Sequence, residues 1–600
     1  MIPQNLGQLF RDTVSRFPDK KAVYFKEGGE YRSFSWSELS EKVDAAAQGL
    51  LRHGLKPGER IAILSENRPE WAIVDLAAQS IGAATVPIYP SLTSAEIEYI
   101  LSDSGARLVA LSSSSQFEKM IPIQKSLPLL CGVIAFDAAV SLAKDSITVP
   151  LFILKDLFKE DGLKVDIASV NASIRADAIA SIIYTSGTTG VPKGVMLTHL
   201  NFIRNAVLSK EALNMSESDH HLSFLPLCHV FERLAGYYLM IYIGASIAYA
   251  ENLDAVPRNL LETKPTFIMG VPRFYEKIKD RVLEAVDAAS SVRKGLFYWA
   301  RDLGAKKRLA VSQNGKKGVI FHLQCKLAEK LVYGKFKARL GGRVRFCISG
   351  GAALSREIAE FFSDLGVMIY EGYGLTETSP VISVNREGRY KFGTVGIPLE
   401  GVEVQISEEG EVLTKSPCVM KGYFNKPEET AAVLKEGWFY TGDLGHLDKE
   451  GFLAITGRKK ELIVTSGGKK VAPQPIEEAM QKDPLIVRCV LFGEGKKFLT
   501  ALVIPRKEKI LEYAKEQKIA CSSYAGLLKD ALIYKFIERH IEECSQNLAN
   551  FEKIKYFCLL ENDFSQSAGE LTPTLKVKRE VVLARYRSEL ERFYNQPHPV

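Results

Sequence analysis

The sequence lacks the cysteine patterns that stabilise small secreted domains or bind zinc. Its nine cysteines are scattered, with no C-x-x-C pair and an odd total, so we expect reduced thiols and neither a disulfide framework nor a zinc site. The first residues, MIPQNLGQLFRD, lack the basic start, the apolar core and the cleavage site of a signal peptide. We therefore expect a cytoplasmic protein.

A clear membrane-spanning run is also missing. Residues 234–250 come nearest, with 17 residues that carry no charge, close to the lower limit for crossing a bilayer. Gly236 and Gly244 interrupt the segment, and Arg233 and Glu251 bound it closely. We predict instead a buried helix that turns into a strand.

The chain is long enough for several domains, and its composition is that of an ordinary soluble globular protein. Of its 600 residues, 46% are hydrophobic and 25% are charged. From residue 55 to residue 115, segments predict strand, helix, strand, helix and strand in turn: GERIAILSEN, RPEWAIVDLAAQSIG, AATVPIYP, SAEIEYILSDSG and ARLVALSS. We expect the second helix to start at a serine cap and to stop at a glycine. This βαβ pattern predicts a parallel sheet.

The same pattern returns at 200–290 and 343–373, and it changes after residue 393. Short strands in VEVQI, GEVLTKS and GFLAITG predict a small antiparallel unit. The charged, glycine-rich segment 457–473 is typical of a hinge or linker. We predict an α/β fold in which a large N-terminal domain, residues 1–459, combines parallel-rich αβ subdomains with the antiparallel unit. A small α+β C-terminal domain would follow over residues 460–600.

The strand predicted before residue 184 leads into YTSGTTGVPKGVMLTH, which ends at residue 199. This stretch holds three glycines, six hydroxyl side chains and one lysine. Glycine lets a backbone approach a ligand closely, and exposed N–H groups, hydroxyls and an ammonium together form a nest for an anion. We predict a phosphate site. It is not a Walker A loop, because Lys193 follows Pro192 and precedes Gly194, so a P-loop kinase or GTPase does not follow.

Five further patches carry glycines beside polar or charged residues. They are SGGAAL (349–354), YEGYGLTETSP (370–380), WFYTGDLG (438–445), GRKK (457–460) and ELTPTLKVKR (570–579). The first follows the predicted strand VRFCI, so its glycines lie at a strand's carboxyl end, where ligands bind in open α/β sheets. We expect Asp443 to lie in a tight glycine turn. Together the patches supply what a nucleotide triphosphate reaction needs: a phosphate cradle, an aromatic for a base, acids and cations.

These patches, in this order, resemble the adenylate-forming superfamily of acyl-CoA synthetases, peptide-synthetase adenylation domains and luciferases. The resemblance covers nearly the whole chain. LPLCHVFER (225–233) and LTPTLKVKR (571–579), with a long basic insertion between them, are most similar to long-chain fatty acid–CoA ligases. The resemblance implies that a fatty acid is joined to AMP with release of pyrophosphate, and that the acyl group then passes to coenzyme A.

The resemblance also implies how ATP and Mg²⁺ are bound. The phosphate loop would hold the β- and γ-phosphates, Tyr373 would stack on adenine, and Thr376 would contact the α-phosphate. Glu377, helped by Thr185, would bind Mg²⁺, and Asp443 with Arg458 would hold the ribose hydroxyls. The implied ATP-binding set is Thr185, Ser186, Gly187, Thr188, Thr189, Gly190, Lys193, Gly351, Ala352, Ala353, Glu371, Gly372, Tyr373, Gly374, Thr376, Asp443 and Arg458.

The resemblance also implies that the C-terminal domain is mobile and takes part in catalysis. Lys576 would swing in with it to bridge the substrate carboxylate and the α-phosphate, Lys460 stands at the hinge position, and Gly467 lies where the pantetheine of coenzyme A passes. His229 resembles the residue that orients the fatty carboxylate, although a structural histidine is the alternative. Some bacterial relatives carry a tryptophan gate to the acyl tunnel four residues later. Arg233 stands there in this chain, which puts a tryptophan gate in doubt and leaves an electrostatic gate open.

Two other functions compete with the coenzyme A ligase. Acyl carrier protein presents the same phosphopantetheine thiol as coenzyme A, so the motifs do not separate the two acceptors. A non-catalytic lipid-binding protein on the same fold would be expected to have lost Glu377, Asp443, Arg458 or Lys576, and all four are intact. A carboxylate attacking a polyanion needs neutralising charge rather than an enzyme nucleophile, so the lack of a Ser-His-Asp arrangement is no objection.

The net charge of +7 is unevenly distributed. Residues 293–345 hold 15 Lys or Arg against two acids, Asp302 and Glu329, and aromatic and leucine residues are interleaved with them. Such basic amphipathic helices are typical of a solvated face or of contact with an anionic membrane, here the inner membrane face, and an acidic carrier protein would suit the charge as well. We expect no nucleic-acid partner, because no recognition motif accompanies the charge.

Overall fold

The computed structural model describes residues 2–159, 164–185, 191–312, 318–521, 523–566, 568–572 and 576–595. The chain divides into two compact units. The first unit comprises residues 1–405, 413–441 and 447–454, and the second comprises residues 406–412, 442–446 and 455–600. The predicted boundary between residues 459 and 460 remains a prediction.

An eight-stranded sheet in the first unit carries the start of the predicted phosphate loop. Its order is β19-β9-β8-β4-β3-β5-β6-β7, with β3 to β8 parallel and with β9 and β19 added antiparallel at one edge. Helices α3 (Pro69–Ser80) and α4 (Ser94–Ser104) connect successive parallel strands, which confirms the predicted βαβ pattern. The strands are β3 (Arg60–Leu64), β4 (Ala84–Ile88), β5 (Leu108–Leu111), β6 (Gly132–Ala135), β7 (Leu151–Ile153), β8 (Ile179–Thr185), β9 (Lys193–Thr198) and β19 (Gly422–Tyr423).

Helix α4 shows one error in the sequence prediction. Its cap is Thr93, whose hydroxyl accepts from the Glu96 N–H while the Glu96 carboxylate accepts from the Thr93 N–H. The predicted serine cap is wrong, because Ser94 is the first helical residue. A capping box requires the acidic residue three positions after the cap, and Glu96 stands three after Thr93. The helix ends at Gly105 in the left-handed conformation, as predicted.

A second, nine-stranded sheet has the order β16-β15-β14-β13-β12-β10-β11-β1-β2. Its central strands, from β14 to β1, are parallel, so the pattern predicted for 200–290 and 343–373 is confirmed. The strands are β1 (Lys21–Glu27), β2 (Glu30–Ser35), β10 (His220–Ser223), β11 (Ser246–Tyr249), β12 (Phe267–Gly270), β13 (Phe346–Ser349), β14 (Met368–Gly374), β15 (Val381–Val384) and β16 (Ile397–Pro398).

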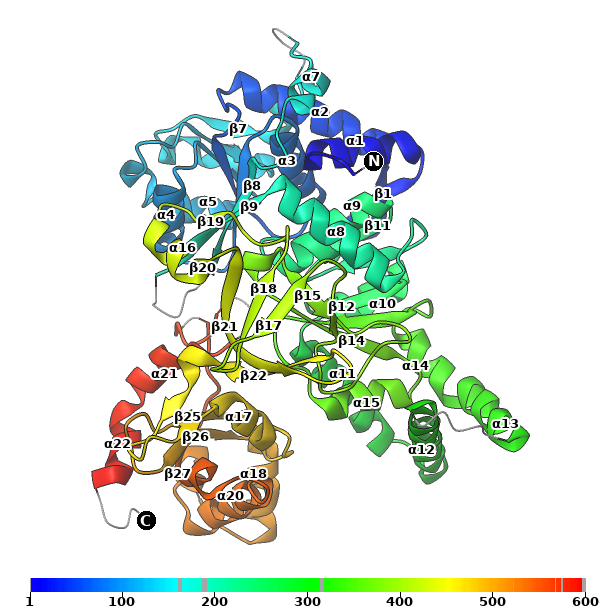
Figure 1. The fold of residues 1–600 in the computed structure, drawn as a ribbon, viewed down its shortest axis with the longest axis vertical. Helices are drawn as coiled ribbons and strands as arrows, with labels where there is room; N and C mark the ends of the chain where they lie inside the picture. The colour runs from blue at the N-terminus through cyan, green and yellow to red at the C-terminus, as the bar shows by residue number, and fades with distance from the viewer. Residues whose placement is uncertain are drawn as a thin grey trace. The chain divides into compact units, whose positions relative to one another are not determined.

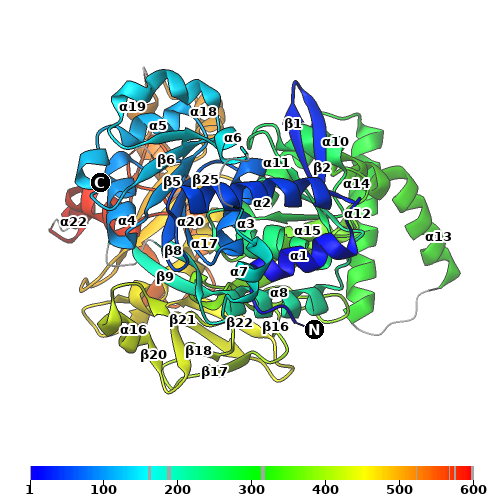
Figure 2. The same ribbon diagram turned by 90° about the horizontal axis from the view of Figure 1, so that it is seen from above.

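Helices cover these sheets and extend beyond them at one margin. Helix α12 packs against α15, and both views show α12, α13 and α14 together at the edge of the first unit, away from strands β3 to β8 (Figures 1 and 2). The main helices are α1 (Leu6–Arg16), α2 (Trp36–Arg52), α8 (His199–Leu213), α10 (Val256–Thr263), α11 (Pro272–Asp287), α12 (Ser291–Ser312), α13 (Val319–Ala328), α14 (Gly334–Arg339) and α15 (Arg356–Asp364).

The uncharged segment 234–250 folds as predicted. A π-helical turn, η3 (Glu232–Tyr238), continues into α9 (Leu239–Ile243) and then into strand β11, and nearly every residue of the segment is buried. Within the part of the chain that the structure describes, no helix is both long and apolar enough to cross a bilayer.

A five-stranded sheet confirms the predicted antiparallel unit and corrects one detail. Strands β17 (Glu403–Ile406), β18 (Glu411–Lys415), β21 (Trp438–Leu447) and β20 (Leu434–Lys435) lie in this order, and β22 (Leu453–Arg458) pairs with β21. Asp443 lies inside β21, so the tight turn predicted there is wrong. Gly442 has φ of 72°, and such a glycine marks an irregularity in a strand as readily as a reversal.

The C-terminal part of the second unit has its own α+β core. Strand β26 (Leu499–Pro505) pairs antiparallel with β25 (Ile486–Phe492) and parallel with β27 (Ile554–Leu559). Helices α17 (Pro473–Gln481), α18 (Lys507–Glu516) and α20 (Ala531–Cys544) bury apolar residues on this sheet, and α21 (Arg579–Arg585) and α22 (Arg587–Asn595) end the chain's described part. The fold class is therefore the predicted one.

A buried ion pair in the first unit links η3, which follows β10 of the nine-stranded sheet, to α3, β4 and β8 of the eight-stranded sheet region. Arg233 in η3 lies 2.5 Å from Asp75 in α3, and both side chains are fully buried. The guanidinium also donates to Ser181 in β8 (2.9 Å) and to Thr85 in β4. Burial has the largest single effect and lowers the pKa of Arg233, but Asp75 together with Tyr238 and Tyr237 outweighs it, and the net effect raises that pKa. An electrostatic gate at this position would have to break this network.

We expect Asp75→Asn to destabilise the first unit strongly. It leaves the Arg233 guanidinium buried without its carboxylate, and breaking one partner of a buried pair typically costs about 3–5 kcal/mol. Urea unfolding followed by tryptophan fluorescence measures this loss. Asp177→Asn, which removes one partner of the exposed Arg175–Asp177 pair, is the matched control and should change the midpoint far less. Equal shifts for the two variants would contradict a special role for the buried pair.

Candidate active site

The two strands that flank the predicted phosphate loop are fixed against each other. Strands β8 and β9 pair antiparallel up to Thr185 opposite Lys193, so the ends of the loop are held side by side. Both side chains are partly exposed to solvent. Ser186, Gly187, Thr188, Thr189 and Gly190 lie outside the described residues.

Lys193 belongs to a cluster of four side chains, which we call the lysine cluster: Lys193, Glu377, Tyr423 and Glu429. The Lys193 ammonium lies 2.6 Å from Glu429 and 5.2 Å above the ring of Tyr423. The Tyr423 hydroxyl donates to Glu377 at 2.9 Å. Burial, and then the Glu377 carboxylate, raises the pKa of Tyr423 above its ordinary value, so the hydroxyl keeps its proton. The cluster thus brings the predicted phosphate lysine near the predicted Mg²⁺ carboxylate.

Tyr423 and Glu429 were missed by the sequence analysis. Tyr423 reaches the cluster because β19 pairs with β9, with Tyr423 opposite Val195, and Glu429 lies in the short helix α16 (Pro427–Val433) that follows. Neither residue stands in a glycine-rich patch. Only the pairing of strands more than 200 residues apart identifies them.

The loop predicted to line the adenine site follows β13 directly. Gly351, Ala352 and Ala353 are exposed there, and Gly351 has φ of 81°, which favours glycine. Glu371 is buried, and its carboxylate accepts from the Leu354 N–H at 2.8 Å. Glu371 therefore helps to shape this loop from the neighbouring strand, β14.

The residues after Glu371 run along the end of β14. Gly372, Tyr373 and Gly374 pair with β15, and the 3-10 turn η5 (Thr376–Thr378) follows. A Cβ at Gly374 would lie 1.8 Å from the Pro380 carbonyl oxygen, so any larger residue would displace the backbone at the start of β15. Tyr373, Thr376 and Glu377 are all partly exposed, and all three can reach a ligand.

His229 lies in the turn that precedes η3. Its Nδ1 accepts from the Phe231 N–H at 3.2 Å, so a neutral ring carries its proton on Nε2. A Cβ at Gly350 would lie 3.1 Å from the Phe231 ring, which places this turn beside the loop 350–353. The two residues at the start of η3 fix this turn in the core. Glu232 accepts from the Ser223 hydroxyl at 2.6 Å and lies 2.9 Å from His221, and Arg233 makes the buried contacts described above.

The second unit brings together three predicted residues. Arg458 pairs with Asp443 at 2.9 Å, and Lys576 interacts electrostatically with both of them. Desolvation by the surrounding protein, and then the charge of Arg458, lower the pKa of Lys576, whereas Asp443 and Glu461 partly oppose the change; the net pKa is about 8. Lys576 is nevertheless exposed to solvent, and water moderates such a shift. The Lys576 backbone exchanges hydrogen bonds with Thr572 (2.7 and 3.0 Å), which fixes the start of the side chain.

Lys460 and Gly467 lie on the surface of the second unit, in the predicted hinge segment. Lys460 is in the 3-10 turn η6 (Lys459–Glu461), directly after β22. Gly467 is in the turn of a small hairpin formed by β23 (Ile463–Val464) and β24 (Lys470–Val471), and a Cβ built on it would meet no atom within 4 Å among the described residues beyond its chain neighbours. A turn of this kind lets another molecule approach the backbone closely.

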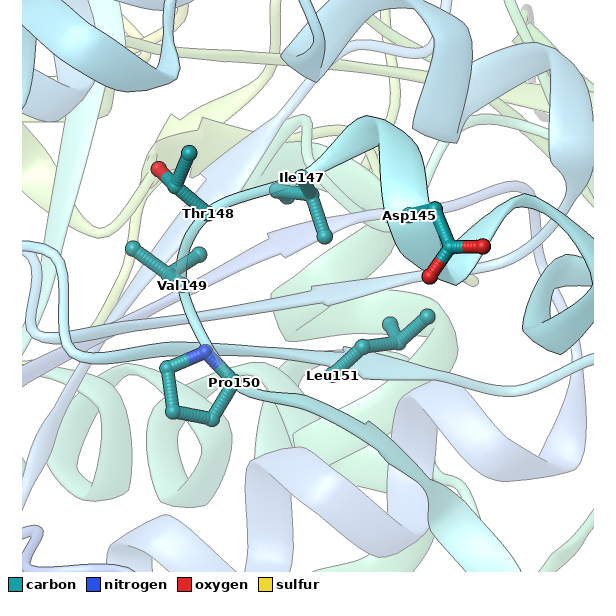
Figure 3. A pocket seen from close by; sticks show the side chains of 6 residues that line it. All are labelled: Asp145, Ile147, Thr148, Val149, Pro150 and Leu151. Carbon is teal, nitrogen blue, oxygen red and sulfur yellow. The ribbon is translucent and has the colours of Figure 1, made fainter.

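The first unit also carries a surface pocket that none of these residues lines. It opens between the 3-10 helix η2 (Ala138–Ser146) and β7 (Figure 3). Its lining residues are Asp145, Ile147, Thr148, Val149, Pro150 and Leu151. None of the candidate site residues lines this pocket, so we assign it no part in the reaction.

Comparison with known proteins identifies the class of the protein. The model of the AMP-binding enzyme family matches residues 10–424, and that of the AMP-binding enzyme C-terminal domain matches residues 460–598. The chain therefore belongs to the AMP-binding enzyme family, and it is an adenylate-forming, acyl-activating enzyme.

Similar proteins are known both by sequence and by structure. The long-chain-fatty-acid–CoA ligase FadD15 of Mycobacterium bovis is 34% identical over 95% of this chain and 93% of its own length. The human long-chain-fatty-acid–CoA ligase ACSBG1 is 30% identical over 99% of this chain and 86% of its own. The adenylation domain of a carboxylate reductase from Mycobacterium chelonae is 22% identical with a TM-score of 0.77, covering 99% of this chain and 91% of its own. At this level of identity, the similarity to the carboxylate reductase domain supports a shared fold and nothing about the substrate.

We expect Glu429→Gln to lower the KM for ATP up to about fivefold, as befits a partly exposed ion pair. If Lys193 binds the nucleotide phosphates, its contact with Glu429 must be exchanged for them, and the variant removes this competition. Steady-state kinetics at varied ATP measures the effect. Glu428→Gln changes the exposed neighbouring carboxylate and is the control. A raised KM would contradict the prediction and show that Glu429 holds Lys193 in its working position.

Proposed function

We propose that the protein is a long-chain fatty acid–CoA ligase that forms AMP. The fatty carboxylate attacks the α-phosphate of ATP, forming acyl-AMP and releasing pyrophosphate. The thiol of coenzyme A then attacks the acyl carbonyl, and AMP leaves. The observation that carries this proposal is the lysine cluster, which sets Lys193 and Glu377 together at the end of a glycine-rich loop. The two fatty acid–CoA ligase relatives support the choice of acid and acceptor.

Each end of ATP has its own binding residues in this proposal. The loop from Thr185 to Lys193 binds the β- and γ-phosphates, and Thr376 contacts the α-phosphate. Adenine lies on the loop 351–353 with Tyr373 against its face. Asp443 and Arg458, which pair with each other, exchange that contact for the ribose hydroxyls, because both groups form strong charge-assisted hydrogen bonds.

The residues present fit a magnesium ion. Mg²⁺ prefers oxygen ligands and in nucleotide enzymes is held by one or two carboxylates together with substrate phosphates and water. Glu377 and Thr185 offer oxygens alone, Glu377 is partly exposed, and no cluster of three or more metal-binding side chains exists among the described residues. When bound, the ion would neutralise the charge of the triphosphate and of the departing pyrophosphate.

The enzyme's own side chains do the remaining work on the carboxylate. His229 donates from Nε2 to a carboxylate oxygen and orients it toward the α-phosphate. Lys193 and Lys576 offset the repulsion between the carboxylate and the phosphates, and this stabilisation grows as charge develops in the transition state. Rotation about Lys460 then removes Lys576 and presents Gly467, past which the pantetheine thiol reaches the acyl carbonyl.

A screen of pyrophosphate release tests this proposal. Fatty acids of graded length are supplied with ATP and with coenzyme A, acyl carrier protein or no acceptor. We expect release that needs Mg²⁺, peaks with long chains and yields acyl-CoA. Acyl transfer to carrier protein alone would make the protein an acyl–carrier-protein synthetase. Absence of release with every acid would leave only lipid binding on the same fold.

We expect Lys576→Ala to separate the two half-reactions. Adenylation should fall on the order of 100- to 1000-fold, as when other single groups aimed at transition-state charge are removed. The same variant, given synthetic acyl-AMP and coenzyme A, should form acyl-CoA at nearly the parent rate. Single-turnover kinetics of each half-reaction measures both. Equal losses in the two halves would mean that one fixed arrangement does all the chemistry.

The pKa of Lys576 gives this reaction a pH dependence. A lysine acts here only as the protonated ammonium, and its pKa is lowered to about 8. Adenylation should therefore fall as the pH rises through about 8, although bound anions will move the midpoint upward. Lys576→Arg keeps its charge at every such pH, so any activity that it retains should lose this fall. An identical alkaline limb in both proteins would assign the titration to another group.

A further inference from the structure

Helix α13 carries an apolar face that the protein leaves open to solvent. Four of its side chains are strongly exposed: Val319 (77%), Ile320 (74%), Leu323 (61%) and Leu327 (49%). Their spacing places them on one side of the helix. Phe321, Cys325 and Ala328 lie on the other side and pack toward the core. The helix is therefore held by one apolar face while a second apolar face remains unburied.

The position of α13 suits contact with a large surface. It packs on α12 and continues directly into the π-helical turn η4 (Glu329–Tyr333), and both views show it projecting at the margin of the first unit (Figures 1 and 2). None of the candidate active-site residues belongs to it. A face of this kind on a projecting helix marks an interaction site.

The segment 293–345, which contains α13, is strongly basic. Lys307, Lys326, Lys330 and Lys335 are exposed, and among the described residues none of them has a carboxylate partner. Other cations of the segment are already paired: Arg308 lies 2.8 Å from Asp364, and Lys337 lies 3.0 Å from Glu329. Lys326 flanks the apolar face directly. An apolar stripe bordered by unpaired lysines is typical of a helix that lies in a membrane interface.

We infer that α13 lies in the surface of an anionic membrane, with Val319, Ile320, Leu323 and Leu327 among the lipids and the lysines against their headgroups. The excess of 15 basic over two acidic residues in 293–345 makes an anionic bilayer the matching partner. It disfavours a second copy of the chain at this face, because like charges would oppose each other. The inference stands apart from the proposed reaction, since it concerns binding without turnover.

Vesicle sedimentation of the full chain tests the inference. Phosphatidylcholine vesicles are compared with vesicles that also contain phosphatidylglycerol, at low and high salt. We expect binding to the anionic vesicles only, weakened by salt because screening shortens the range of the charges. Ile320→Glu with Leu323→Glu should reduce the bound fraction roughly tenfold or more, and so should Lys307→Gln with Lys326→Gln and Lys330→Gln. Leu253→Glu with Leu261→Glu, at exposed apolar positions elsewhere in the first unit, should bind like the parent.

Tryptophan fluorescence adds a readout that a folding defect does not imitate. Leu323→Trp should show a blue shift on adding anionic vesicles, and Leu253→Trp should not. Failure of the parent protein to bind, or binding that survives both sets of α13 substitutions, would overturn the inference. The inference would also be overturned if the parent protein formed an oligomer that Ile320→Glu with Leu323→Glu converted to a monomer, because this face would then be an interface between copies. Binding of an acidic protein by the parent, without binding of anionic vesicles, would overturn it as well.

Discussion

The buried contact between Arg233 and Asp75 is the constraint on which the rest of the active-site region depends. The Arg233 guanidinium contacts α3, β4 and β8, and β8 is the strand that leads through Thr185 into the predicted phosphate loop. The same residue belongs to the π-helical turn that follows His229. An ion pair without access to water is costly unless its hydrogen bonds are satisfied, so these elements have little freedom to shift independently. The loop end and the histidine turn are thereby tied to one point in the core.

The charges that would meet ATP are held in pairs. Glu429 lies against Lys193, and Asp443 lies against Arg458. Such pairing keeps like charges apart and orients each side chain, while every contact can be exchanged for a phosphate or a hydroxyl of the substrate. Lys576 differs, because its neighbours include both Arg458 and two acids and its pKa is lowered toward neutrality. A cation poised in this way gains most from the arrival of negative charge, which is the role proposed for it in adenylation.

Much of this arrangement could be predicted from the sequence, because it depends on local signals. The alternation of apolar strands and helices gave the parallel sheets correctly, and the glycines after β8 and β13 marked the strand ends. The errors have physical reasons. Thr93 rather than Ser94 caps α4 because Glu96 completes the capping box only with Thr93. Asp443 lies in a strand because β21 continues through Gly442 despite the positive φ of that glycine. Tyr423, Glu429 and the partners of Arg233 come from distant strands and helices, and no local pattern announces such contacts.

The central claim is that the acid is activated through an acyl-adenylate bound by these residues. The most direct measurement follows oxygen-18 from the carboxylate of a labelled fatty acid during conversion to acyl-CoA, with mass spectrometry of the nucleotide product. The account predicts one labelled oxygen in AMP for each acyl-CoA formed, because the carboxylate oxygen that attacks the α-phosphate leaves with AMP. Unlabelled AMP, or label in inorganic phosphate with ADP as product, would contradict it.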